Sequence, residues 1–127
     1  MPTVADYAVL NDGPFELGAG DSFTLPPFFR PDNFVVGTNR AKTILAFKCR
    51  PNISQPTGIG VTFTVTKGVP PEQIIGPTSL NTGTVHGFWE AFPATGFGQN
   101  VATPIHFNVE LGSAVFSDVI LWYQVSV

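Results

Sequence analysis

Residues 101–127 constrain the fold most, because apolar and polar side chains alternate along them in two long stretches. In residues 105–111, Ile105, Phe107, Val109 and Leu111 alternate with polar residues, the period of a strand with one buried face. Residues 114–127 carry apolar side chains on both faces, which predicts a strand that is central or covered by a partner. The Gly112-Ser113 pair between the two stretches predicts a tight hairpin turn.

Shorter strand patterns fill the rest of the chain, and Gly, Pro and Asn residues separate them. Residues 42–50 and 61–66 are the clearest, since β-branched and aromatic residues alternate with polar ones there. Further strands are expected over residues 4–10, 15–17, 22–25, 34–36, 74–75 and 84–92, with loops over residues 51–60 and 93–100. No stretch shows helical periodicity beyond one turn. The chain is therefore expected to be all-β with no substantial helix: one antiparallel β-sandwich domain over residues 1–127, of the jelly-roll kind.

The composition favours self-association. Hydrophobic residues make up 43% of the chain and charged residues only 12%, about half the usual share. Twelve Phe exceed what we expect the interior of such a domain to hold, so a second copy is expected to cover some apolar surface. A net charge of −3 and six scattered Lys and Arg residues argue against nucleic acid as a partner. No apolar run has the length of a membrane span.

The only cysteine, Cys49, follows an apolar run and is expected to be a buried, inert thiol. A single cysteine excludes an intrachain disulfide. No basic segment followed by an apolar one opens the chain, so no signal peptide is visible. The expectation is a cytoplasmic protein or one exported by a non-classical route.

The C-terminal part of the chain carries a further pattern. It reads Gly98-Gln99-Asn100, then Ile105-x-Phe107-x-Val109, Gly112 and Phe116-Ser117-Asp118-Val119-x-Leu121-Trp122. This pattern resembles the C-terminal part of small bacterial jelly-roll domains of the carbohydrate-binding-module type. The resemblance implies a domain that binds glycans through exposed aromatic rings and polar loop groups. Some such domains hold a structural Ca²⁺; their acidic calcium loop is not recognisable here, so no cofactor is expected.

The residues around Trp89 form the main candidate site for a ligand. A sugar stacks its apolar C–H face on an indole, and its hydroxyls need carboxylate or amide partners. We expect Trp89 to supply the stacking ring, and we expect its polar partners to be His86, Glu90, Gln99 and Asn100. The alternative is that Trp89 and Trp122 are core or interface residues.

Metal binding and catalysis receive little support from the sequence. His106, Asn108 and Glu110 share one strand face, but no metal-ligand spacing accompanies them, and a solvated face is the simpler interpretation. Glu90, Glu110 and Asp118 are the only carboxylates that would suit hydrolysis, and their spacing places no two across a cleft. Asp118, between Phe116 and Ile120, is expected to make a structural hydrogen bond or meet a cation, because an unpaired buried charge is too costly.

Phe28 and Phe29 lie between prolines, and we expect both rings to be exposed and, with Trp122, to contact another protomer. Two functions fit these features. The first is a noncatalytic, lectin-like module that binds glycans and self-associates. The second is a structural subunit of a shell, fibre or appendage that uses its Phe-rich loops as contacts.

Overall fold

The computed structural model describes residues 2–36, 41–53, 60–94 and 97–127. In chain order its strands are β1 (Thr3–Asn11), β2 (Phe15–Gly18), β3 (Ser22–Thr24), β4 (Ala41–Asn52), β5 (Val61–Lys67), β6 (Glu72–Leu80), β7 (His86–Pro93) and β8 (Ile105–Ser126). Most of the loop predicted over residues 51–60 lies outside the described residues, and Pro51 and Asn52 belong to β4.

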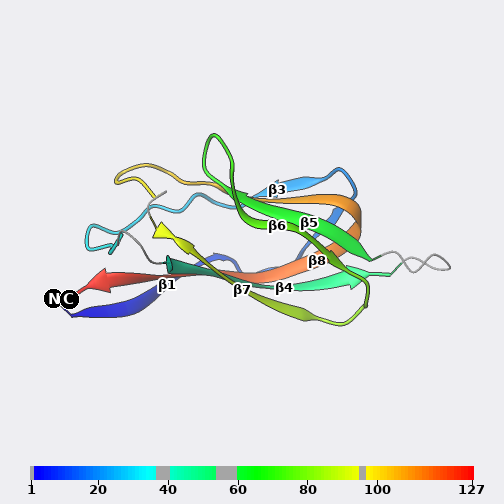
Figure 1. Cartoon of the computed structure of the whole chain (residues 1–127), viewed down its shortest axis with the longest axis horizontal. Helices are drawn as coiled ribbons and strands as arrows, with labels where there is room; N and C mark the ends of the chain where they lie inside the picture. Colours follow the sequence, from blue (N-terminus) through cyan, green and yellow to red (C-terminus); the bar gives the residue numbers. More distant parts are fainter. Residues whose placement is uncertain (1, 37–40, 54–59, 95–96) are drawn as a thin grey trace.

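The strands pair antiparallel into one curled sheet, which folds into the two layers seen in Figure 1. The lower layer contains β7, β4 and residues 113–126 of β8, with β1 and β2 along the far side of β8. The upper layer contains β6, β5, residues 105–112 of β8, and β3. No α-helix occurs in the described part of the chain, and none of its segments is a helix with the length and apolar character needed to cross a membrane. The predicted all-β, antiparallel sandwich is confirmed.

The predicted hairpin at Gly112-Ser113 is wrong, because β8 runs through this point as one strand and passes from the upper to the lower layer. Gly112 provides the bend, with a φ of 71° that glycine adopts without steric cost. A Cβ on Gly112 would lie 1.7 Å from the carbonyl oxygen of Gly60, so the two backbones approach too closely for any side chain at this position. The same residue pair that predicts a turn is here the corner of the sandwich.

A bulge in β8 reverses which side chains face the core. Between Ala46 and Lys48 of β4, β8 contains one extra residue in the pairing. Asp118 lies in this bulge with a φ of 54°, a left-handed conformation that Asp tolerates better than most residues. Phe116 points into the core before the bulge and Val119 points into it afterwards. The expectation of one unbroken alternation along this stretch is therefore wrong, and the bulge directs Asp118 outward.

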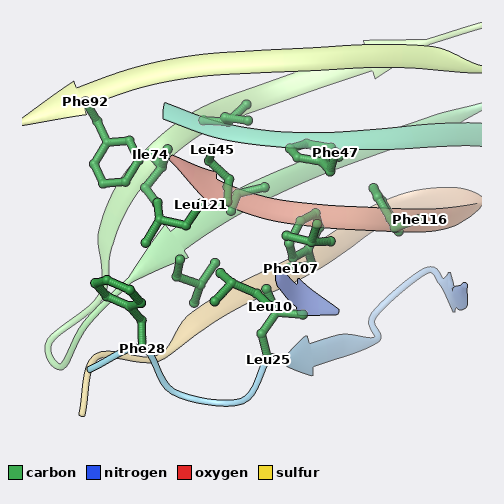
Figure 2. Close-up of a cluster of buried hydrophobic side chains, with 14 of the residues drawn as sticks. Leu10, Leu25, Phe28, Leu45, Phe47, Ile74, Phe92, Phe107, Phe116 and Leu121 are labelled. Carbon is green, nitrogen blue, oxygen red and sulfur yellow. The ribbon is translucent and has the colours of Figure 1, made fainter. Parts of the chain in front are cut away.

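The core between the layers is rich in phenylalanine, as Figure 2 shows. Eight of the twelve Phe are buried, three more pack partly buried against them, and Phe29 alone is exposed, at 60%. The interior therefore holds far more Phe than the composition led us to expect. Phe28 is only 5% exposed and packs edge-on against Phe97, so the prediction of an exposed Phe28 ring at an interface is wrong. The prediction failed because the chain after Pro27 turns inward, where the Phe28 backbone pairs with Thr103.

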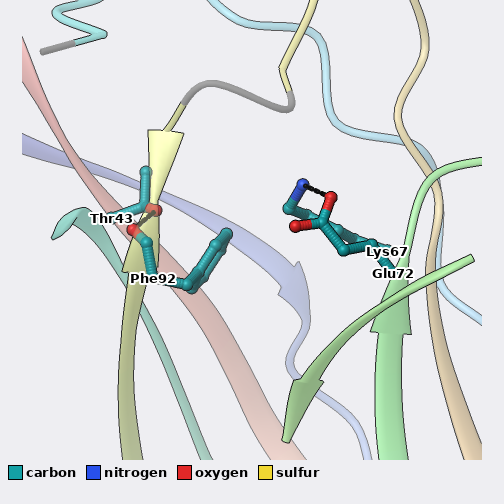
Figure 3. A network of polar contacts seen from close by, with 4 residues as sticks. All are labelled: Thr43, Lys67, Glu72 and Phe92. Atoms are coloured by element: carbon teal, nitrogen blue, oxygen red, sulfur yellow. Dashed lines mark hydrogen bonds and ion pairs between the residues drawn. The ribbon is translucent and has the colours of Figure 1, made fainter. Parts of the chain in front are cut away.

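The polar side-chain atoms buried within the described part of the chain are paired, and Figure 3 shows two of these interactions. The fully buried Thr43 donates its hydroxyl hydrogen to the carbonyl oxygen of Phe92 at 2.7 Å. The ammonium of Lys67, 5% exposed, lies 3.2 Å from Glu72 Oε2. Cys49 is fully buried, as predicted, and burial raises the pKa of its thiol from 9.0 to about 12.

Candidate functional site

The outer face of the lower layer carries a set of apolar and aromatic side chains from four strands. Cross-strand pairing sets them in two neighbouring rows. The first row runs Tyr7, Trp122, Ile44, and the second runs Val9, Ile120, Ala46, Trp89. Residues that pair across adjacent strands share one face of a sheet. We call these seven residues the aromatic face.

The rings of the aromatic face are open to solvent. Trp89 is 78% exposed, Tyr7 53% and Trp122 36%. The rings of Tyr7 and Trp122 pack against each other, with centroids 5.0 Å apart and planes inclined by 42°. A pocket of about 260 Å³ lies between Trp89 and Trp122; Ile44 forms part of its wall. An exposed indole on each side of a shallow apolar pocket is suited to a flat, partly apolar ligand.

Polar groups stand at both ends of this apolar surface. Gln124 lines the 260 Å³ pocket. A second hollow of about 480 Å³ is lined by both tryptophans together with Lys48 and Asp118. The Lys48 ammonium lies 3.3 Å from Asp118 Oδ2, and both side chains remain about half exposed. Asp118 thus meets a cation, as expected, but at the surface rather than among buried rings. The arrangement offers amide, carboxylate and ammonium groups to the hydroxyls of a bound molecule.

His86 and Glu90 do not lie beside Trp89 as expected, and their predicted binding roles remain predictions. They pair with two buried residues of β4, Cys49 and Leu45, so their side chains lie on the face of β7 opposite to Trp89. The reason is the period of two along a strand, which sends neighbours in sequence to opposite faces. Gln99 and Asn100 are exposed, and neither lines either of the pockets that Trp89 lines. The predicted binding roles of these two residues remain predictions.

The polar partners that the structure places around Trp89 come from other strands. Lys48 lies on β4, and Asp118 and Gln124 lie on β8. Period-two alternation alone identifies Trp89 and Gly87 as sharing a face. The positions opposite them depend on the strand order and on the bulge at Asp118, and the sequence carries no separate signal for either.

The residues considered for metal binding and catalysis are dispersed. The described residues contain no cluster of three or more His, Cys, Asp or Glu side chains able to hold a metal ion. His106 Nδ1 lies 2.9 Å from the Thr24 hydroxyl, which occupies that ring nitrogen. Asp118 is on the outer face of the lower layer, Glu90 is on the opposite face of β7, and Glu110 is on the upper part of β8. No two of these carboxylates line one pocket among those found in the described residues.

Several solved structures are similar to this one. It matches the C-terminal CBM6 of LamC, a marine laminarinase from Zobellia galactanivorans, with a TM-score of 0.55 and 11% identity over 96% of this chain and 99% of that one. It matches a β-porphyranase of glycoside hydrolase family 86 from the human gut bacterium Bacteroides plebeius with a TM-score of 0.62 and 13% identity, over 98% of this chain and 21% of that one. The structure of infectious bursal disease virus, Gt strain, matches with a TM-score of 0.56 and 12% identity, over 97% of this chain and 32% of that one.

These likenesses concern the fold, because all three identities are low. The fold is the β-sandwich of jelly-roll type that the sequence predicts. The chain spans about a third of the viral chain and about a fifth of the porphyranase chain, and it covers almost the whole of the CBM6 domain. No protein-family model and no curated protein matches the sequence.

Proposed function

We propose that this chain is a noncatalytic glycan-binding module whose binding surface is the aromatic face. The observation that carries the proposal is the exposure of Trp89, 78%, on the same face as Trp122. Neither indole is needed to fill the core, which eleven Phe side chains already occupy or line. An exposed pair of indoles beside a pocket of about 260 Å³ calls for a ligand that covers them.

The chemistry of the surroundings favours a sugar over a purely apolar ligand. A pyranose ring presents an apolar C–H face to an indole and hydroxyls around its rim. Gln124 stands on one side of the tryptophans, and the Lys48–Asp118 ion pair on the other. An ion pair of this kind donates from the ammonium and accepts at the carboxylate, so it matches neighbouring hydroxyls of one sugar. The ligand class we infer is a neutral glycan.

The fold supports the proposal. A CBM6 domain of nearly the same extent shares this fold, and such a domain is by its name a carbohydrate-binding module. We infer the absence of catalysis from the dispersed carboxylates. Most glycoside hydrolases use two carboxyl groups about 5–10 Å apart across one sugar, and here Glu90 and Asp118 lie on different faces of the lower layer.

The test is a glycan array, followed by calorimetric titration of the strongest ligand. Trp89→Ala removes one stacking ring, worth about 1.5–3 kcal/mol when covered, so the dissociation constant is expected to rise roughly 10- to 150-fold. Phe29→Ala is the matched control, because Phe29 is an exposed ring that lines neither pocket. Equal affinities for the wild type and Trp89→Ala would place the binding site elsewhere, and a blank array would end the proposal.

The second candidate is a structural subunit that assembles into a shell, fibre or appendage. It is favoured by the low charge and by exposed apolar side chains away from the aromatic face, such as Phe29, Val101 and Leu111. A viral particle protein shares the fold. A large or open assembly in light scattering, together with a blank glycan array, would support this function instead.

A further inference from the structure

Five strands form the borders of the two layers and pair on one side only within the described residues: β1, β2, β3, β6 and β7. Unpaired strand edges bind other strands unless the sequence prevents it. The three-residue β3 runs into Pro26 and Pro27, and β6 contains Pro77 and breaks in its register. These two edges of the upper layer are therefore blocked. β2 is only four residues long, which leaves β1 and β7 as long edges of the lower layer.

Charge distinguishes β1 from β7. Each strand carries one acidic side chain on its inward face, Asp6 in β1 and Glu90 in β7. Pairing β1 with a second β1 sets Asp6 against another Asp6 or an apolar residue, because β1 contains no basic side chain. β7 contains His86 on the same face as Glu90, four residues away. Antiparallel pairing of two β7 strands therefore allows each carboxylate to meet an imidazole.

The register that achieves this also fits the other side chains. If two copies of β7 pair antiparallel about a two-fold axis at Phe88, His86 of each copy lies opposite Glu90 of the other copy. The symmetry therefore creates two His86–Glu90 pairs. In the same register Trp89 lies opposite Gly87 of the second copy. Gly87 is exposed, and a Cβ placed on it meets nothing within 4 Å, so there is open space above it that a large ring can cover. Pairing an aromatic residue with a cross-strand glycine is a stabilising arrangement in sheets.

The hydrogen bonds of His86 are compatible with this pairing. Its Nε2 lies 3.0 Å from the Thr82 hydroxyl. In the tautomer that accepts this hydroxyl proton at Nε2, the other nitrogen, Nδ1, carries a hydrogen to donate to a carboxylate. The alternative register, centred on Trp89, sets Glu90 against Phe88 and leaves both acidic groups without a partner.

We infer that the chain forms a closed, two-fold symmetric dimer through β7, with Phe88 on the axis and two His86–Glu90 pairs between the copies. The lower layers then join into one continuous sheet, and the two aromatic faces lie side by side on the same surface. The occupant of this edge is a second copy because the strand is complementary to itself. If the aromatic face binds glycans, the dimer presents two sites to one polysaccharide and gains avidity. The dimer itself does not depend on glycan binding.

The test is a charge exchange followed by sedimentation velocity. The wild type is expected to have about twice the chain mass of 13.6 kDa at micromolar concentration. His86→Glu places two pairs of carboxylates opposite each other and is expected to raise the dissociation constant of the dimer at least tenfold. The double variant His86→Glu/Glu90→Lys restores opposite charges and is expected to return within about threefold of the wild-type dissociation constant. Ser22→Glu, on the exposed edge strand β3, is the control and should leave the mass unchanged.

Each outcome decides the inference. Rescue by the double variant establishes both the strand and the register, since no other register sets residue 86 against residue 90. A monomeric wild type, an unchanged dimer in His86→Glu, or a double variant no better than the single one overturns it. A mass that grows beyond two copies with concentration overturns the closed dimer in favour of head-to-tail pairing. Urea unfolding of each variant, followed by circular dichroism, verifies that loss of the dimer is not loss of the fold.

Discussion

Replacing Gly112 by alanine is expected to destabilise the fold strongly, because β8 passes between the layers at this residue. Two costs add. An L-residue at a φ of 71° costs about 1 kcal/mol. The new Cβ would lie 1.7 Å from the Gly60 carbonyl oxygen, which is backbone and cannot rotate away. Forcing the strands apart at this contact costs a further 1–3 kcal/mol or so, as in overpacked cores. We expect the free energy of unfolding to fall by about 2–4 kcal/mol.

Gly20 provides a control for the backbone contribution. Its φ is 84°, but a Cβ on it would meet nothing within 4 Å. Gly20→Ala is therefore expected to lower the free energy of unfolding only through the unfavourable backbone conformation, by about 1 kcal/mol. Urea unfolding of both variants, monitored by circular dichroism, gives the two differences directly. If Gly112→Ala and Gly20→Ala lower the free energy of unfolding equally, the close approach of Gly112 in β8 to Gly60 does not shape the sandwich, and the reasoning is refuted.

Three further predictions concern buried groups. Thr43→Val leaves the Phe92 carbonyl oxygen without its 2.7 Å hydrogen bond and is expected to lower the free energy of unfolding by about 1–3 kcal/mol, measured in urea. Glu72→Gln removes the carboxylate that faces the buried Lys67 ammonium and is expected to lower the urea midpoint, whereas an unchanged midpoint would show that solvent already satisfies the ammonium. Because burial raises the pKa of the Cys49 thiol from 9.0 to about 12, the folded chain should resist thiol reagents at pH 8, and stability should decline as pH rises from about 9 toward 12, a decline that Cys49→Ala reduces.

Alternating side chains predict strands, and the strands predict a sandwich, because one face of each must be buried. The hairpin at Gly112-Ser113 failed for a physical reason: a turn and a corner both require the conformational freedom of glycine. Only the pairing partners distinguish them, since the two halves of β8 bond to different strands and not to each other. The predicted exposure of Phe28 is wrong for a similar reason, since proline residues on both sides of Phe28-Phe29 mark a loop without indicating which ring turns inward.

The sequence points to Trp89 as the centre of the candidate site, but it does not indicate which residues surround Trp89. The sequence singles out Trp89 because an indole is suited to stacking on a sugar, and the structure shows this side chain 78% exposed. Its predicted partners were chosen by closeness in sequence, and the alternation of the strand sends His86 and Glu90 to the other face. Tyr7 and Asp118 reach the same face as Trp89 through strand order and through the β8 bulge, which are properties of the whole sheet.

The central claim is that glycans bind on the aromatic face, and tryptophan fluorescence tests it most directly. The chain has two tryptophans, and both line the two pockets on that face. Titrating the protein with soluble neutral polysaccharides is expected to give a saturable change in tryptophan emission in the wild type and in Phe29→Ala, with a much weaker response in Trp89→Ala. Saturable binding by calorimetry with no change in emission would show that the sugar binds elsewhere and would contradict the claim.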